Sequence, residues 1–234
     1  MGIFLGLTPF IAFFMFESTH MPYDFDEATA PFEPYARYMG FAQVSEARRA
    51  RIVNRYHDAV HYVDGLVGQV LRSLVRNGLA DDTIVIVTGD HGEEFHEHGF
   101  WGHATGFTPE QVRVPLVLYV PGMPPRRYDD VTSHVDLPPT VLGLLGVRNP
   151  PSDYGVGRSL FDGRPTTAAV SCDDEECALV EPEDTVTFGV GTADLAGVEL
   201  RDSEYRRIHA SKATLRARST QVLDLMARTR DFLQ

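Results

Sequence analysis

The chain has 234 residues, of which 43% are hydrophobic and 23% charged, a composition that fits a globular domain with a proper core and excludes disordered and fibrous proteins. Its 33 acidic residues outnumber the 21 basic ones, which gives a formal net charge of -12. A charge of this sign repels nucleic acid and anionic membrane surfaces, so we expect no nucleic-acid partner. An anionic substrate needs locally positive groups or a metal ion to be held by such a protein.

Residues 2–16 are strongly apolar, so a signal peptide or a membrane span has to be considered first. The stretch is shorter than the ~20 residues that a spanning helix needs, it lacks basic residues at its start, and Pro9 interrupts it. We therefore expect a buried strand over residues 10–16, followed by a loop rich in proline and acidic residues.

Apolar residues recur at alternating spacings of three and four from Val53 to Leu74, which predicts one long helix with a packed face that stops at Gly78. The β-branched run TIVIVT at residues 83–88 is typical of a strand buried on both faces of a parallel sheet. Strand, helix and strand in this order indicate a right-handed crossover unit.

Two further elements follow. Residues 114–120 predict another core strand, and Asp136 before two prolines predicts the start of a short helix that stops at Gly146. The first 165 residues therefore predict an α/β domain whose central sheet is mostly parallel and flanked by helices.

Residues 166–234 have a different texture, with short β-like pieces at 168–171, 185–190 and 205–209 and a helical pattern over 213–233. We expect a small antiparallel portion with a closing helix there. The only cysteines, Cys172 and Cys177, have no zinc-motif spacing, and a disulfide between them stays open.

The chemistry concentrates in residues 89–103, which hold four of the nine histidines. Asp90 and His91 follow the predicted strand directly, and the carboxyl ends of strands are where open α/β sheets place ligands. An adjacent carboxylate and imidazole can meet one divalent cation. The alternative is that Asp90 caps a turn and His91 makes a neutral hydrogen bond. The density of polar groups in this loop argues against that alternative, because each of them needs a hydrogen-bond partner.

Several ordered motifs resemble the sulfatase branch of the alkaline phosphatase superfamily. They are DTIVIVTGDHGE (82–93), GH (102–103), VRVPLV (112–117) and HVDLPPTV (134–141), and FFMFESTHMPY (13–23) is similar to a family strand that ends in His-x-Pro-Tyr. Within the superfamily, HMPYD (20–24) and YGVGRSLF (154–161) resemble membrane-anchored sulfatase-like proteins of the YejM type. The resemblance implies an alkaline phosphatase-like fold over about residues 10–161.

The resemblance also implies roles for four residues. Asp90 and His91 match the family's paired ligands of a divalent metal ion, which is calcium, manganese, magnesium or zinc. His20 matches a histidine that contacts the sulfate or phosphate group or its leaving oxygen. His103 matches a Lys or His that binds the substrate anion, or a second metal in two-metal branches. Such groups neutralise the charge that develops on a tetrahedral anion, and His20 or His103 has the chemistry to protonate a leaving alkoxide.

Other histidines have weaker patterns. His96 and His98 are candidate ligands that are more often solvated in a polar loop, and His57 and His61, one helical turn apart, more often flank a packed face. His134 and Asp136 are expected to shape the loop before the short helix.

Family members carry acidic metal ligands and a Cys, Ser or Thr nucleophile before the part that this chain resembles, and the sequence holds no Cys-x-Pro-x-Arg stretch. We therefore expect a truncated metal-dependent hydrolase of sulfate or phosphate esters that lacks its nucleophile segment. We expect its substrate to be a small-molecule, lipid or glycan ester. From the resemblance we also expect it to work on the periplasmic side of a membrane, with a tether through a missing N-terminal region. The alternative is a non-catalytic sensor or binding domain of a membrane-anchored protein.

Overall fold

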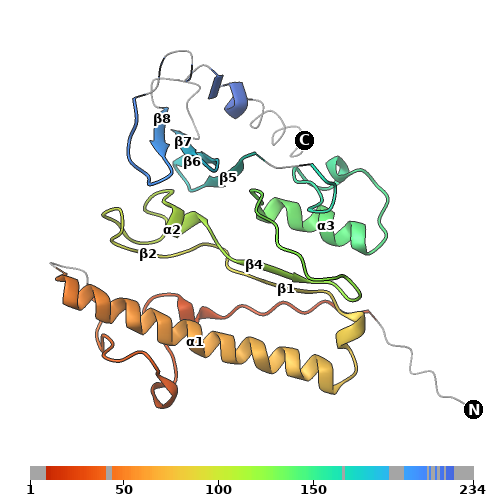
Figure 1. The fold of residues 1–234 in the computed structure, drawn as a ribbon, viewed down its shortest axis with the longest axis horizontal. Coiled ribbons are helices and arrows are strands. Elements are labelled where there is room, and N and C mark those ends of the chain that lie inside the picture. The colour runs from red at the N-terminus through yellow and green to blue at the C-terminus, as the bar shows by residue number, and fades with distance from the viewer. Residues whose placement is uncertain are drawn as a thin grey trace, which may run out of the picture. The chain divides into compact units, whose positions relative to one another are not determined.

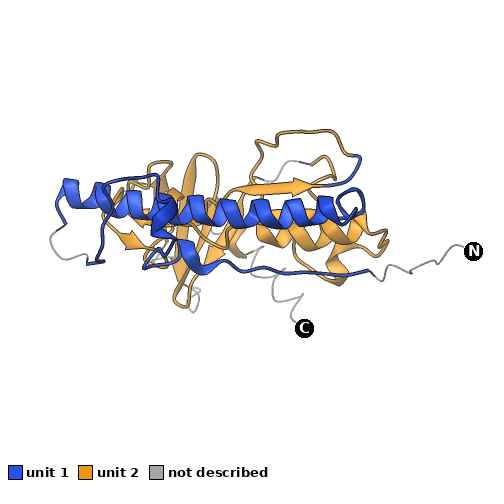
Figure 2. Cartoon of the chain, turned by 90° about the horizontal axis from the view of Figure 1, so that it is seen from below, with its two compact units in different colours: residues 1–84, 120–122 blue, residues 85–119, 123–234 orange. Residues whose placement is uncertain are grey.

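The structure is a computed structural model that describes residues 9–40, 44–164, 167–189 and 198–209, together with residues 211, 214, 217–218 and 220–223 (Figure 1). The chain forms two compact units (Figure 2). Unit 1 comprises residues 1–84 and 120–122, and unit 2 comprises residues 85–119 and 123–234.

Unit 1 is built on the long helix α1, Glu46–Arg76. The helix begins where the Ser45 side chain accepts a hydrogen bond from the Arg48 N–H, and it ends before Gly78, whose φ of 66° reverses the chain. The predicted helix is thus confirmed. A 3-10 turn at Ala80–Asp82 follows it.

The segment before α1 contains two 3-10 turns, Glu17–Thr19 and Glu27–Thr29, and is otherwise irregular. Arg55 of α1 ties it down through hydrogen bonds from its guanidinium to Pro22 O (2.6 Å), Ala36 O (3.2 Å) and Asp24 Oδ1 (3.0 Å). One planar guanidinium group makes all three hydrogen bonds. It therefore holds the irregular segment, whose described residues belong to no strand, against the helix.

The predicted buried strand over residues 10–16 is wrong. Ile11 is 97% exposed and Phe13 is 86% exposed, and no strand within the described ranges pairs with this segment. An apolar run meets the side-chain requirement of a strand, but a strand also needs a neighbouring backbone to bond. The strand, helix and strand unit predicted from it is therefore not formed.

Unit 2 begins with β1, Val85–Thr88, which pairs with β4, Leu116–Tyr119. Both predicted core strands form, but they run antiparallel, as do all strand pairs in the described part of the chain. The predicted mostly parallel sheet is thus corrected to small antiparallel sheets. Moreover β1 alternates between half-buried and exposed residues instead of being buried on both faces, because β-branched composition fixes neither the direction nor the partner of a strand.

Between β1 and β4 lie a short hairpin and a short helix. The hairpin pairs β2, Glu94–Phe95, with β3, Trp101–Gly102, and the helix α2 spans Pro109–Val112. After β4 a 3-10 turn, His134–Asp136, leads into α3, Leu137–Leu144. The Ser133 and Asp136 side chains form a capping box there, so the predicted helix start is confirmed. A last 3-10 turn spans Pro151–Asp153.

A four-stranded antiparallel sheet in the order β5-β6-β7-β8 confirms the predicted small antiparallel portion. Its strands are Ala169–Cys172, Glu176–Val180, Asp184–Gly189 and Glu199–Asp202. The expected β-piece at 205–209 contributes only a bridge between Arg207 and Arg201. Of the expected helix over 213–233, residues 214, 217–218 and 220–223 are helical and the others lie outside the described residues. A division of the chain at residue 165 stays a prediction.

Candidate active site

The loop after β1 is fixed in place by backbone contacts. Gly92 donates its N–H to Gln111 O at 2.7 Å, and a Cβ atom on Gly92 would lie 1.9 Å from Glu110 O. Only glycine lets the loop approach the α2 backbone so closely. On the other side His134 Nε2 lies 2.8 Å from Gly89 O, so the two residues that flank Asp90 and His91 are both held.

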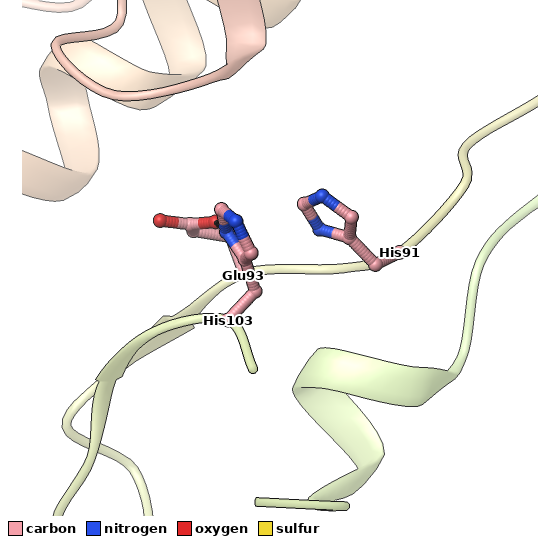
Figure 3. A group of neighbouring side chains, drawn as sticks. All are labelled: His91, Glu93 and His103. Carbon is pink, nitrogen blue, oxygen red and sulfur yellow. Dashed lines mark hydrogen bonds and ion pairs between the residues drawn. The ribbon is translucent and has the colours of Figure 1, made fainter. Parts of the chain in front are cut away.

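Three side chains of this region form a candidate cation site. One ligand atom from each of His91, Glu93 and His103 lies within 4.8 Å of the others, and no second group of three such ligands occurs among the residues that the structure describes. His91 and His103 stack with ring centroids 3.8 Å apart, and Figure 3 shows the Glu93 carboxylate beside the His103 ring. Two imidazoles and one carboxylate are a donor set that divalent cations such as zinc or manganese accept, so the residues present fit the metal that the resemblance implies.

Glu93 orients His103. Its carboxylate lies 2.8 Å from His103 Nδ1, and the Glu93 side chain is only 5% exposed. A hydrogen bond of this kind places a proton on Nδ1, which makes Nε2 the acceptor or metal-facing nitrogen of the neutral ring. The pair therefore gives His103 one defined tautomer and one ring orientation.

Asp90 is next to this trio but outside it. Its Oδ1 accepts a hydrogen bond from the His91 N–H at 3.1 Å, its Oδ2 lies 3.8 Å from His91 Nε2, and its side chain is 69% exposed. The predicted pair of ligands, Asp90 and His91, thus lies side by side. The structure adds Glu93, which the sequence reasoning missed although its position two residues after His91 puts both side chains on one side of an extended chain.

Glu94 holds the loop together from inside. This fully buried carboxylate accepts hydrogen bonds from the Thr108 hydroxyl (2.7 Å), the Gln111 amide (3.0 Å) and the backbone N–H groups of His98 and Phe100 (both 2.9 Å). Burial by itself raises the pKa of Glu94, but these hydrogen bonds outweigh it and leave the pKa below its usual range. Glu94 therefore stays ionised and fixes both ends of the segment that carries His103.

A pocket of about 270 Å³ opens beside these residues. Asp90, His91 and His103 line it together with Phe107 and Gln111 from the α2 region. Residues of the β5–β6 hairpin complete its lining, namely Ser171, Cys172 and Asp173. A pocket of this size next to convergent imidazoles and a carboxylate is the arrangement expected of an active site.

Three of the other predicted histidines have structural partners. His98 Nε2 lies 2.9 Å from Glu110 Oε2, and the His96 ring packs 5.6 Å from Trp101. In unit 1 the His57 ring packs 5.3 Å from Phe32. His61 is exposed on α1.

His20 and Asp136, from the sequence motifs, also have local partners. His20 in unit 1 is exposed, and its Nδ1 lies 3.0 Å from Met21 O. Asp136 in unit 2 is buried, and its carboxylate accepts hydrogen bonds from the N–H groups of Ser133 and Arg158, which confirms its role in shaping the loop. A catalytic role for His20 stays a prediction.

Sequence comparison bears out the resemblance. A sequence profile of the family described as Sulfatase matches residues 7–147, more than half of the chain. The chain belongs to the sulfatase family. Choline-sulfatase of Rhizobium meliloti (strain 1021) is 32% identical over 134 residues, which cover 57% of this chain and 24% of that protein. The inner membrane protein YejM of Salmonella typhimurium is 28% identical over 172 residues, 69% of this chain and 28% of YejM.

The fold of the sulfatase chain is similar to that of a solved phosphonate monoester hydrolase. The crystal structure of phosphonate monoester hydrolase of Agrobacterium radiobacter matches with a TM-score of 0.64 at 22% identity, over 80% of this chain and 43% of that one. This sulfatase chain spans about a quarter of the length of the two curated relatives above. No helix in the described ranges combines the length and the apolar character needed to cross a membrane.

Proposed function

We propose that this sulfatase-family chain contributes a divalent-metal site and an anion-binding histidine to a hydrolase of sulfate or phosphate esters. The observation that carries the proposal is the convergence of His91, Glu93 and His103 in one cluster, in a chain of this family. Asp90, His91 and His103 line one pocket. The match to the sulfatase family supports this hydrolase function rather than that of a non-catalytic binding domain.

The residues divide the work by their chemistry. Asp90 and His91, with Glu93 close by, would hold a divalent cation, which when bound neutralises the charge of the ester group. His103, held at Nδ1 by Glu93, turns Nε2 to the ligand and in its protonated form donates a hydrogen bond to an ester oxygen. His20 belongs to this proposal through its sequence motif, as a second histidine for the ester group or its leaving oxygen.

We also propose that the protein works outside the cytoplasm, on the periplasmic side of a membrane. The Cys172–Cys177 disulfide supports this compartment because disulfides persist in oxidising environments. The similarity to an inner membrane protein is a second support, and a membrane tether is part of the same proposal.

The test is alanine substitution in the full-length gene product. We expect Asp90→Ala and His91→Ala each to lower kcat/KM for aryl sulfates or aryl phosphates at least 100-fold and to abolish Mn²⁺ or Zn²⁺ binding in titration calorimetry. His61→Ala, on the exposed surface of α1, is the matched control and should leave both unchanged. Full turnover in either site variant would overturn the proposal.

A further inference from the structure

The tip of the β5–β6 hairpin lines the same pocket as the candidate catalytic residues. Ser171, Cys172 and Asp173 share that lining with His91 and His103. The hairpin lies outside residues 7–147, the part that matches the family. This wall of the pocket therefore lies beyond the part of the chain that the sequence profile matches.

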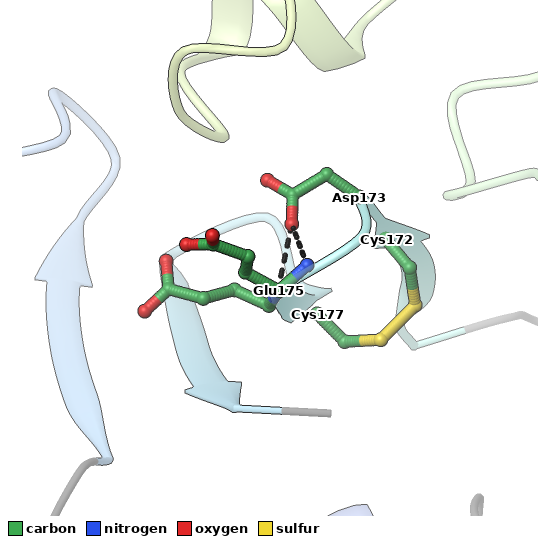
Figure 4. Close-up of a disulfide and its surroundings, with 5 residues drawn as sticks. Cys172, Asp173, Glu175 and Cys177 are labelled. Atoms are coloured by element: carbon green, nitrogen blue, oxygen red, sulfur yellow. Dashed lines mark hydrogen bonds between the residues drawn. A yellow bond between two sulfur atoms is a disulfide. The ribbon is translucent and has the colours of Figure 1, made fainter. Parts of the chain in front are cut away.

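Covalent and hydrogen bonds fix the hairpin tip, as Figure 4 shows. The disulfide joins Cys172 to Cys177, its direct partner in the strand register. Asp173 Oδ1 accepts hydrogen bonds from the N–H groups of Glu175 (2.9 Å) and Glu176 (2.7 Å), and the Asp173 N–H donates to Glu176 O. These two backbone donors fix the orientation of the Asp173 carboxylate, so the carboxylate has a defined place in the pocket lining.

The hairpin is also fixed relative to the loop that carries His103. Ala178 of β6 is fully buried in a cluster with Phe107 and Tyr205. The Phe107 N–H donates a hydrogen bond to the Tyr205 hydroxyl at 2.9 Å. Phe107 itself lines the pocket, so the cluster joins both of its walls through packed side chains.

The charges around the pocket are unequal. The lining residues include two carboxylates, Asp90 and Asp173, and neither lysine nor arginine occurs among them within the described part of the chain. In the proposed function the cation and the histidines neutralise the sulfate or phosphate group. The rest of the substrate then meets Asp173 with no basic residue to offset it.

We propose that Asp173 is a specificity-determining residue that selects esters whose organic part carries a positive charge, such as an amine or a quaternary ammonium group. An anionic organic part is disfavoured by the same carboxylate. The proposal rests on the proposed function, because it assigns the organic end of the ester to the hairpin side of that pocket.

The test uses matched 2-aminoethyl and 2-carboxyethyl esters of sulfate and of phosphate, which differ mainly in the charge of the organic part. Binding is measured by titration calorimetry in the presence of Mn²⁺, and kcat/KM is measured with the full-length gene product. We expect the wild type to favour the aminoethyl ester at least 10-fold in both measurements. Asp173→Asn, which keeps an acceptor oxygen for the turn, should reduce that ratio at least fivefold, and Asp173→Lys should invert it.

Asp129→Asn removes a carboxylate from an exposed loop outside the pocket lining and should leave the ratio unchanged. The double variant Cys172→Ser/Cys177→Ser is a second test, because it removes the disulfide that fixes the tip of the β5–β6 hairpin. It should also lower the ratio of aminoethyl to carboxyethyl ester while the ester group still binds. If the wild type hydrolyses both esters with a ratio near one, or if Asp173→Asn leaves the ratio unchanged, this inference alone is overturned. A wild type that binds and hydrolyses neither ester overturns the proposed function as well.

Discussion

At the scale of single residues, Glu93 and Glu94 show how neighbouring carboxylates take opposite roles. Glu93 contacts His103, which lines the pocket, whereas Glu94 is fully buried among hydrogen-bond donors. Successive side chains of an extended chain point to opposite sides, so one carboxylate becomes available to a ligand and the other becomes structural. The sequence of two adjacent glutamates does not indicate which one contacts His103 and which one is buried.

Glu94 makes the folded state sensitive to acid. Its pKa is lower in the folded protein than in the unfolded chain, so ionised Glu94 stabilises the fold at pH values above the unfolded-state pKa. This stabilisation is lost as the pH falls through the folded-state pKa. We expect Glu94→Gln to lower the free energy of unfolding at pH 7 by about 1–3 kcal/mol, since the amide satisfies the donors poorly. The difference from wild type should shrink as the pH approaches 3, measured by urea unfolding with EDTA present. A difference that is the same at both pH values would show that the charge of Glu94 has no part in stability.

The candidate site could be predicted from sequence as far as Asp90, His91 and His103, because the first two follow a recognisable strand and the third has a family motif. Glu93 required the structure, since its contact with His103 depends on the β2–β3 pairing that sets Glu94 opposite Gly102. The pocket wall at Asp173 lies 70 residues beyond His103, and such a distant contact leaves no local pattern.

At the scale of elements, the helices were predictable, whereas the partner and direction of the predicted core strands were not. The spacing that defines α1 and the capping residues that start α3 are local signals, so both helices form where expected. Strand pairing is non-local, because the run at β1 predicts a strand without naming β4 as its antiparallel partner. The strand predicted over residues 10–16 was wrong for the same reason, because its apolar sequence does not identify a pairing partner.

The contact between the loop after β1 and helix α2 gives a prediction at this scale. Gly92→Ala would bring Cβ to 1.9 Å from Glu110 O, so the loop or α2 has to move. We expect about 1–3 kcal/mol of lost stability and at least a 10-fold weaker affinity for Mn²⁺, because His91 and Glu93 flank this glycine. Chemical unfolding and titration calorimetry measure the two effects.

Gly65→Ala is the matched control, since Gly65 lies inside α1 with open space where its Cβ would stand. That change should stabilise the protein by about 0.5–1 kcal/mol, as alanine has the better helix propensity. If the two substitutions had the same effect, the close approach at Gly92 would not govern the site.

At the scale of the whole molecule, the chain has two compact units and the cation cluster lies entirely within the second. A ligand that binds only the folded form stabilises the part that supplies its donors. Unit 2 also contains the small sheet with its disulfide, so its melting reports on both the cluster and the hairpin wall.

We expect Mn²⁺ or Zn²⁺ at 100 times its dissociation constant to stabilise the folded chain by about 2.7 kcal/mol, which corresponds to a rise in Tm of about 5–10 °C for a chain of this size. Differential scanning calorimetry should show the rise in the transition that depends on unit 2, and a variant with both His91→Ala and His103→Ala should lose it. His96→Ala provides the comparison within the same loop, because the His96 ring packs near Trp101 outside the cluster and its loss should leave the metal-induced rise intact. Since a cation held by surface carboxylates elsewhere would raise the Tm of the double variant as much as that of the wild type, equal shifts would place the metal away from these histidines.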